Sequence, residues 1–305
     1  MTVAEGDIDG GRLLADAQSE VVDATDRLFD QLLQVPEDPR ERLYQAMRHA
    51  AIGGGKRLRP LLVRAAGDLY HVDRNLSLRV GAAVEAMHVY SLIHDDLPCM
   101  DDDDLRRGKP TVHRAYDEAT AVLAGDSLHA LAFEWLVDPA THADPFVRSE
   151  LIRELARAAG PAGMAGGQMM DLAAETAQFD LPTVTRLQQL KTGALIAFSV
   201  EAGAILARIP AEGRTPLRGY ARDIGLAFQI ADDIMDVEGD EQLAGMALHT
   251  DAAAGMATFV TLMGLDRARE QAVALVDQAI GHLAGFGEEA TLLRAIARYI
   301  VERDR

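Results

Sequence analysis

The chain has a single cysteine, Cys99, among 305 residues, so an intramolecular disulfide is impossible. At this length a hydrophobic core can stabilise the fold without disulfides or a structural metal. The N-terminus lacks a basic segment followed by an apolar run, which argues against a signal peptide. The longest mostly apolar stretch, between 191 and 208, is interrupted by Glu201 and is too short to span a bilayer. We therefore expect a cytoplasmic protein that does not insert into a membrane.

Positive charge is also scarce. Lysine and arginine together number 30, against 48 aspartates and glutamates, and the formal charge is −18. Because sequence-independent nucleic-acid binding depends on basic side chains that neutralise phosphates, we expect no nucleic-acid partner. The only lysines are Lys56, Lys109 and Lys191. All three fall in segments whose motifs are described below.

Alternating runs of β-branched residues are absent, and apolar residues recur at three- and four-residue steps nearly everywhere. The stretches 79–93 and 193–207 are apolar on most faces, as expected of buried central helices. No linker or shift in composition divides the chain, so we predict one all-α domain over 1–305, with 1–10 as a flexible N-terminus. Helices are predicted over 11–34, 40–52, 58–70, 77–97, 117–136, 146–159, 183–207, 214–236, 254–283 and 289–302.

Two aspartate-rich segments lie far apart in the sequence. The first is SLIHDDLPCMDDDDLRRGKP over 91–110, and the second is FQIADDIMDVEGD over 228–240. Asp232 and Asp236 share a helix face, where like charges repel unless a cation neutralises them. A charged run is usually a solvated surface, but both segments follow apolar helical stretches. Because Mg²⁺ binds one or two carboxylates together with waters and substrate phosphates, the pattern favours two walls of a cavity with metal ions between them.

Compact basic segments complement the aspartates. GGGKRLRP over 53–60 places Lys56, Arg57 and Arg59 beside three glycines, and RR at 106–107 follows the first aspartate segment. Lys191 opens an apolar helix in the sequence KTG. Each segment alone is also explained by a surface ion pair. Arginine binds phosphate bidentately and lysine binds it as a point charge, so together the segments indicate a site for two polyphosphates.

Several segments in this order resemble the trans-isoprenyl diphosphate synthases, or polyprenyl synthetases, and most of all the short-chain bacterial farnesyl diphosphate synthases. They are GGGKRLRP (53–60), HVYSLIHDDLPCMDDDDLRRGKPTVH (88–113), LAGDSL (123–128), GGQMMDL (166–172), KTGALI (191–196), FQIADDIMDVEGD (228–240) and YIVERDR (299–305). The resemblance implies an isoprenoid-synthase-type helical bundle around a deep central cavity, usually a homodimer. It implies head-to-tail 1′-4 condensation of isopentenyl diphosphate with dimethylallyl or geranyl diphosphate to give farnesyl diphosphate.

The same resemblance assigns roles to individual residues. Three Mg²⁺ ions on the allylic diphosphate would be held by Asp95, Asp96, Asp101, Asp232, Asp233 and Asp236. Isopentenyl diphosphate would be held by Lys56, Arg59, His88 and Arg107. The allylic diphosphate and its developing cation would be contacted by Arg106, Lys191, Thr192 and Gln229. Without the family motifs, the alternative interpretation of His88 is a histidine buried in the core, and that of Gln229 is a residue that forms a hydrogen bond between helices.

In the family that the chain resembles, the residues four and five positions before the first aspartate motif help to set product length. Tyr90 precedes Asp95 by five residues, about 7.5 Å along a helix axis, where its ring would form the floor of the cavity. A tyrosine there, with the DDxxxxD spacing, resembles enzymes that stop at C15. A C20 product, geranylgeranyl diphosphate, is the alternative, because Ser91 is small and Met87 would leave depth beneath.

The segment after the second aspartate motif departs from the family. Two lysines that the family carries are replaced here by Met246 and Met256. The loss of an ammonium group near a diphosphate predicts a slowed enzyme, and a non-catalytic homologue that binds prenyl diphosphates is an alternative. A class I terpene cyclase is disfavoured because it needs no separate basic pocket. Met164, Met169 and Met170 are expected to fill the core.

Overall fold

Helices follow one another along almost all of the chain in a computed structural model, which describes residues 3–174, 176–238 and 257–302. A π-helical turn (Gln189–Gly193) joins α9 to α10, and short 3-10 turns cover Ala211–Arg214 and Glu288–Ala290. The helices are α1 (Val3–Leu32), α2 (Glu41–Ala51), α3 (Leu58–Asp68), α4 (Arg74–Asp95), α5 (Val112–Ala115), α6 (Glu118–Val137), α7 (Pro145–Ala159), α8 (Met164–Ala174), α9 (Leu181–Gln188), α10 (Ala194–Leu206), α11 (Thr215–Glu238), α14 (Phe259–Met263), α15 (Leu265–His282) and α16 (Thr291–Glu302).

The all-α prediction is confirmed, with four local corrections. A two-stranded antiparallel hairpin, β1 (Leu105–Arg106) and β2 (Lys109–Pro110), was missed because strands this short show no alternation. Helix α8 was missed because two glycines interrupt its apolar pattern. The predicted helix 183–207 contains the π-helical turn. The predicted helix 254–283 is divided by Gly264, whose φ of +84° favours glycine.

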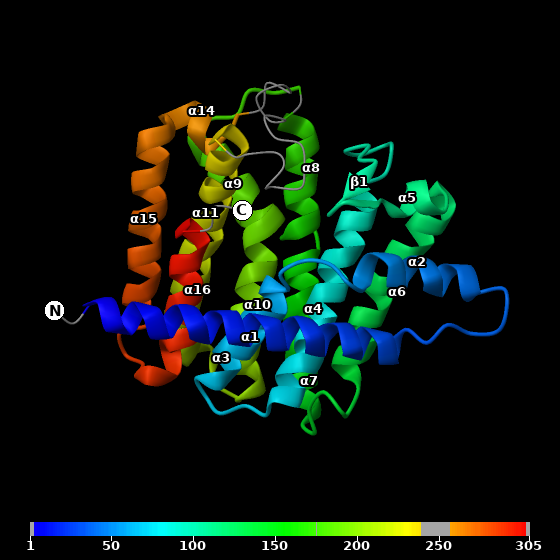
Figure 1. The fold of residues 1–305 in the computed structure, drawn as a ribbon, viewed down its shortest axis with the longest axis horizontal. Helices are drawn as coiled ribbons and strands as arrows, with labels where there is room; N and C mark the ends of the chain where they lie inside the picture. Colours follow the sequence, from blue (N-terminus) through cyan, green and yellow to red (C-terminus); the bar gives the residue numbers. More distant parts are fainter. Residues whose placement is uncertain (1–2, 175, 239–256, 303–305) are drawn as a thin grey trace.

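Helices α3, α4 and α10 lie in the middle of the bundle, with α1 running across them (Figure 1). Helices α15 and α16 lie toward one end in this view, and α2, α5 and α6 toward the other. Helix α10 contributes to two apolar clusters: Leu195 belongs to the cluster that contains residues of α4 and α6, whereas Ile196 and Val200 belong to the one that contains residues of α11, α15 and α16. The predicted burial of the apolar stretches in α4 and α10 is confirmed.

Many aspartates of this acidic chain cap helices. Asp73, Asp117, Asp144 and Asp180 each precede a helix and accept a hydrogen bond from a backbone N–H in its first turn. Such caps satisfy backbone N–H donors that have no partner within the helix.

Helix α1 begins at Val3, inside the segment 1–10 for which flexibility is predicted. In the described ranges no helix is both long and apolar enough to cross a membrane.

Candidate active site

A cavity of about 380 Å³ lies between α4, α8 and the π-helical turn. It brings together predicted site residues that lie more than 100 positions apart in the sequence. Its lining includes Arg59, His88, Tyr90, Ser91, His94, Asp95, Met100, Met164, Gln168, Met169, Leu172, Lys191 and Thr192. Both sulfur-containing residues of α8 in this wall, Met164 and Met169, were expected in the core. Met164 is buried, whereas Met169 is 65% exposed, so the core prediction is wrong for Met169.

The C-terminal half of α4 builds one wall of the cavity. His88, Ser91 and Asp95 are separated by three and four residues, so they project from one face of the helix. The helix ends at Asp95, and the N–H of Asp101 then donates to the Asp95 carbonyl oxygen at 2.9 Å. This turn folds the first aspartate segment back, so that Asp101 lies beside Asp95.

Burial and like charge perturb the carboxylates of this segment. Burial raises the pKa of Asp95 to about 7; the negative charges of Asp101 and Asp96 act in the same direction, against Lys191 and Arg106. Burial also raises the pKa of Asp96, which is 3% exposed. Desolvated, crowded carboxylates of this kind are stabilised by a cation.

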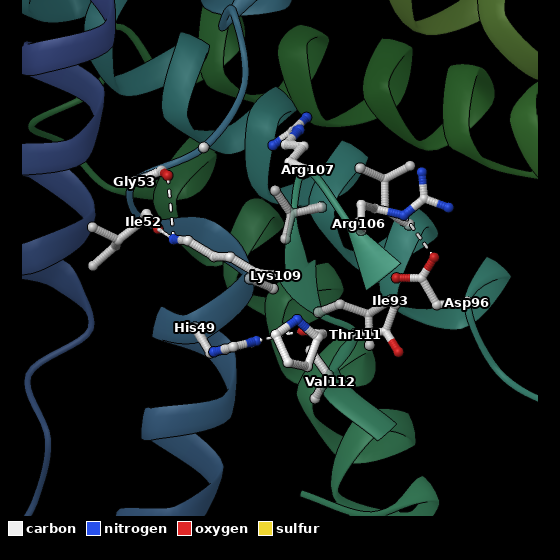
Figure 2. Close-up of a pocket in the computed structure, with 15 residues that line it drawn as sticks. His49, Ile52, Gly53, Ile93, Asp96, Arg106, Arg107, Lys109, Thr111 and Val112 are labelled. Carbon is white, nitrogen blue, oxygen red and sulfur yellow. Dashed lines mark hydrogen bonds and ion pairs between the residues drawn. The ribbon is translucent and has the colours of Figure 1, made fainter. Parts of the chain in front are cut away.

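The β1–β2 hairpin supplies one such cation from the protein itself. Arg106 Nε donates to Asp96 Oδ1 at 2.6 Å (Figure 2). The NH2 group of Arg106 donates to Asp103 Oδ2 at 3.0 Å. Arg106 was predicted to contact the allylic diphosphate. Here it neutralises the most deeply buried carboxylate of the first aspartate segment, so part of its bonding capacity is already used.

The π-helical turn supplies a second cation. Lys191 forms an ion pair with Asp171 of α8 and also lies in the fields of Asp95 and Asp101. Burial lowers its pKa, but these carboxylates outweigh that effect and raise the pKa overall. Glycine makes the approach possible: a Cβ on Gly167 would lie 2.1 Å from the backbone nitrogen of Lys191.

Helix α11 carries the second aspartate segment. A Cβ on Gly225 would lie 3.3 Å from the Cα of Gly193, so α11 passes close to the π-helical turn. Gln229, Asp232 and Asp236 follow Gly225 at steps of four, three and four residues, which places them along the same face. Asp233 is directed differently: it is 7% exposed, and its Oδ2 accepts the N–H of Phe259 at 2.7 Å. One oxygen of this predicted metal ligand therefore joins α11 to α14.

The three basic residues of the segment 53–60 lie in different surroundings. Arg57 points inward, where its NH1 donates to Glu85 at 3.0 Å and its NH2 to Asp26 at 2.6 Å. Lys56 lies 5.5 Å above the ring of Tyr299 in α16. Arg59 lines the cavity, and its Nε is buried without a hydrogen-bond partner among the residues that the structure describes. The segment thus contains one structural arginine, Arg57, and one arginine that lines the cavity, Arg59.

The buried side chains of Arg59 and His88 are both affected by the positive charge of Arg107. Burial lowers the pKa of Arg59; the negative charge of Glu85 opposes this effect, and the positive charge of Arg107 adds to it. Burial also holds the pKa of His88 well below its usual value, helped by Arg59 and Arg107. An anion would relieve both effects and pair the buried Arg59 Nε. The donor set therefore fits a diphosphate.

The carboxylates alone do not form a complete metal cage. In the described part of the chain, no group of three or more His, Cys, Asp or Glu side chains is positioned to hold a metal ion. Mg²⁺ usually takes one or two carboxylates and completes its shell with water and substrate phosphates. The neighbouring carboxylates of Asp95 and Asp101 fit an ion that binds together with a diphosphate.

The residues assigned to product length take different positions. Tyr90 and Ser91 line the cavity. The Tyr90 ring packs edge-on against His129 of α6, with ring centroids 4.9 Å apart, and against His94 at 5.6 Å. Met87 is fully buried in the core and is not part of the cavity lining. Met246 and Met256 lie outside the described residues.

Two polar residues of the GGQMMDL segment were not assigned from the sequence, although the segment itself was recognised as a motif. Asp171 pairs with Lys191, as described above. Gln168 lines the cavity, and both polar atoms of its side chain are buried without a hydrogen-bond partner in the described structure. Their position beside Lys191 follows from the close packing at Gly167, which a single sequence does not reveal.

Known proteins resemble the chain in sequence and in fold. Residues 40–298 match the polyprenyl synthetase family. Farnesyl diphosphate synthase of Escherichia coli K12 is 46% identical over 266 residues, 86% of this chain and 89% of that protein. Geranylgeranyl pyrophosphate synthase of Capsicum annuum is 42% identical, over 86% of this chain and 72% of that protein. A crystal structure of an FPP/GFPP synthase from Zymomonas mobilis is 62% identical, with a TM-score of 0.89 over 94% of this chain and 99% of that one. The chain therefore belongs to the polyprenyl synthetase family and is a prenyltransferase resembling the farnesyl diphosphate synthases.

Proposed function

We propose that this polyprenyl synthetase condenses isopentenyl diphosphate with dimethylallyl and then geranyl diphosphate in the cytoplasm and releases farnesyl diphosphate. The observation that carries the proposal is the division of one cavity into two differently charged regions. Asp95 and Lys191 lie at its acidic side, whereas its other side offers His88 and Arg59, whose Nε is buried without a hydrogen-bond partner in the described structure. Two diphosphates with different binding modes fit this division.

The acidic side suits the allylic substrate. When bound there, Mg²⁺ would offset the charge of the allylic diphosphate, making it a better leaving group. Asp95 and Asp101 from one wall, with Asp232 and Asp236 from α11, would hold three such ions, and Asp96 and Asp233 would keep the two acidic segments in place. Lys191 would contact the departing diphosphate. Thr192 and Gln229 would direct side-chain oxygens toward the allylic carbon as positive charge develops.

The basic side suits isopentenyl diphosphate. Arg59, with Lys56 and Arg107 at its margin, would hold the diphosphate, and a neutral His88 would donate a hydrogen bond to it. In the reaction the allylic C1–O bond breaks, and the alkene of isopentenyl diphosphate attacks C1. The departing diphosphate takes the proton that is then lost. The protein's contribution is to orient both substrates and exclude water, so no protein nucleophile is required.

The cavity wall supports a C15 product. The ring of Tyr90 packs against His129, and this contact restricts its movement. The ring therefore limits the length of a prenyl chain that extends from Asp95 into the cavity. The C20 alternative is supported by the sequence identity to geranylgeranyl pyrophosphate synthases, which is close to the identity to farnesyl diphosphate synthases.

A homodimer is supported by the apolar surface of α6, where the side chains of Val122, Leu123 and Val137 are 40–56% exposed.

The purified protein should be incubated with isopentenyl and dimethylallyl diphosphates and Mg²⁺, and its products separated by chain length. Farnesyl diphosphate as the main product supports the proposal. Geranylgeranyl diphosphate would retain the chemistry and overturn the assigned length. Binding of a prenyl diphosphate without release of inorganic diphosphate would overturn the enzymatic proposal and favour a non-catalytic homologue. Size-exclusion chromatography with light scattering tests the homodimer.

A further inference from the structure

The β1–β2 hairpin and the glycine loop at 53–55 face each other beside the predicted isopentenyl diphosphate site. Figure 2 shows Arg106, Arg107 and Lys109 of the hairpin beside Ile52 and Gly53, around a small cavity of about 50 Å³. Lys56 and Arg59 follow the loop directly in the sequence. The relative position of hairpin and loop therefore sets the spacing of the basic groups that these segments carry.

Lys109 joins the hairpin to the loop. Its Nζ donates to the carbonyl oxygen of Gly53 at 3.2 Å and lies 3.4 Å from that of Ile52 (Figure 2). Both carbonyls follow the end of α2, where unpaired carbonyl oxygens and the helix dipole favour a positive charge. A second link lies beside it: His49 Nε2 donates to the carbonyl oxygen of Pro110 at 2.7 Å.

Helix α1 holds the opposite side of the loop. Asp26 Oδ2 accepts the N–H of Gly53 at 2.9 Å, and its Oδ1 accepts from the buried Arg57. Gly53 is therefore bonded through its N–H to α1 and through its carbonyl to the hairpin. Its φ of +75° is a conformation that glycine adopts without strain.

The fixed loop in turn determines where Arg107 lies. A Cβ on Gly55 would be 2.5 Å from Arg107 Cζ, and one on Gly54 would be 3.3 Å from its NH1. The guanidinium group therefore rests directly on the glycine backbone. Arg107 itself has a φ of +53°, a conformation that costs a non-glycine residue energy and needs support from its surroundings.

We propose that Lys109 is a positioning residue for isopentenyl diphosphate, which links the hairpin to the glycine loop and so holds Arg107 in place beside Lys56 and Arg59. The inference rests on the proposed function and deepens it. A lysine suits this role, because one ammonium group reaches two adjacent carbonyl oxygens and leaves the guanidinium of Arg107 for the ligand. Lys109 acts through the loop and does not touch the diphosphate.

Steady-state kinetics of Lys109→Met test the proposal. We expect the KM for isopentenyl diphosphate to rise about tenfold, the loss typical for one charged hydrogen-bond donor. The KM for geranyl diphosphate and kcat should change less than about twofold. Lys109→Arg should restore most of the affinity, since it keeps a cation at the two carbonyls. Arg42→Met on α2 is the control, because it removes the same charge from an exposed ion pair with Asp117.

A double-mutant cycle separates positioning from direct contact. If Lys109 acts through Arg107, the variant Lys109→Met/Arg107→Met should bind isopentenyl diphosphate about as weakly as Arg107→Met alone. The proposal would be overturned if the losses of affinity caused by the two substitutions multiply in the double variant. It would also be overturned if the KM for isopentenyl diphosphate is unchanged in Lys109→Met, or rises equally in Arg42→Met. If the wild type forms no product, the proposed function fails, and calorimetric binding of isopentenyl thiodiphosphate to the same variants still decides the role of Lys109.

Discussion

Lys191 and Asp171 form an ion pair that joins the π-helical turn to α8 at the acidic side of the cavity. The same ammonium group lies in the fields of Asp95 and Asp101. The Lys191 ammonium group thus interacts with three carboxylates. The ion pair with Asp171, which is not a predicted metal ligand, restricts the rotation of the lysine side chain. A lysine whose position is fixed before the substrate arrives loses less conformational entropy on binding.

Asp171→Asn should weaken binding of the allylic substrate selectively. Without the ion pair, Lys191 is expected to turn toward Asp95 and Asp101, where it competes with cations for these carboxylates. We expect the KM for geranyl diphosphate to rise about three- to tenfold, as for loss of a partly buried ion pair, and the KM for isopentenyl diphosphate to stay within about twofold. Asp277→Asn, an exposed change on α15, is the matched control. An equal rise in both KM values would contradict this role.

His88 should make the ligand-free protein less stable in mild acid. Its pKa in the fold lies well below the ordinary 6.5, so below about pH 6.5 the unfolded chain takes up a proton that the folded chain does not. Stability from this group is complete above pH 6.5 and is lost as the pH falls. Between pH 6.5 and 5.5 the expected loss is about 1 kcal/mol.

The variant His88→Gln carries no such proton, so its urea midpoint should fall less between pH 7.5 and 5.5 than that of the wild type. His71→Asn is the control, because His71 is exposed and its φ of +55° is tolerated by asparagine. Parallel losses in wild type and His88→Gln would show that other groups account for the acid sensitivity.

Arg57 should contribute chiefly to stability rather than to substrate binding. Its side chain is fully buried between Asp26 and Glu85, which is itself 2% exposed. Arg57→Met leaves the Glu85 carboxylate buried without this cation, which we expect to cost about 3–5 kcal/mol of unfolding free energy. The double variant Arg57→Met/Glu85→Leu should recover part of that loss, as measured by chemical denaturation. If the double variant is less stable than Arg57→Met, the penalty does not arise from an unpaired Glu85.

Arg57 also marks the boundary of what the sequence predicts. The segment GGGKRLRP indicates a basic turn, and the position of Arg59 in the cavity agrees with it. Nothing in the spacing shows that Arg57 turns inward, because this depends on its φ of +48° and on Asp26 and Glu85 in distant helices. Periodicity predicts helices well for the same reason that it misses such contacts: it reports the local chain and not its partners.

Other gaps have related causes. The role of Asp233 as a metal ligand stays a prediction, and the sequence does not show that α14 returns to the site, where the N–H of Phe259 donates to one of its oxygens. Asp171 was missed because its partner Lys191 becomes a neighbour only when α8 packs through Gly167 against the π-helical turn. The roles of the metal ligands, basic residues and length-determining residues stay predictions.

Tyr90→Ala should lengthen the product. The ring of Tyr90 lies between the cavity and His129, so its removal opens space below Asp95 that a longer prenyl chain can occupy. We expect the main product to shift from C15 to C20 or longer, with little change in the initial rate of dimethylallyl diphosphate consumption. Tyr90→Phe keeps the ring and should keep the C15 product. A C15 product from Tyr90→Ala would place the length limit elsewhere, with Ser91 as the next residue to enlarge.

Met256→Lys should accelerate turnover of the allylic substrate. The resemblance to the trans-isoprenyl diphosphate synthases implies a lysine at this position that contacts the allylic diphosphate, whereas a thioether has no charge to offset that of the leaving group. Restoring a charged hydrogen bond is expected to contribute about 1.5–3 kcal/mol, equivalent to about ten- to a hundredfold in kcat/KM for geranyl diphosphate. Met246→Lys restores the other lysine and controls for added positive charge, since it should have a smaller effect. An unchanged kcat/KM in Met256→Lys would mean that the cations already present, Lys191 among them, supply all the charge that the departing diphosphate needs.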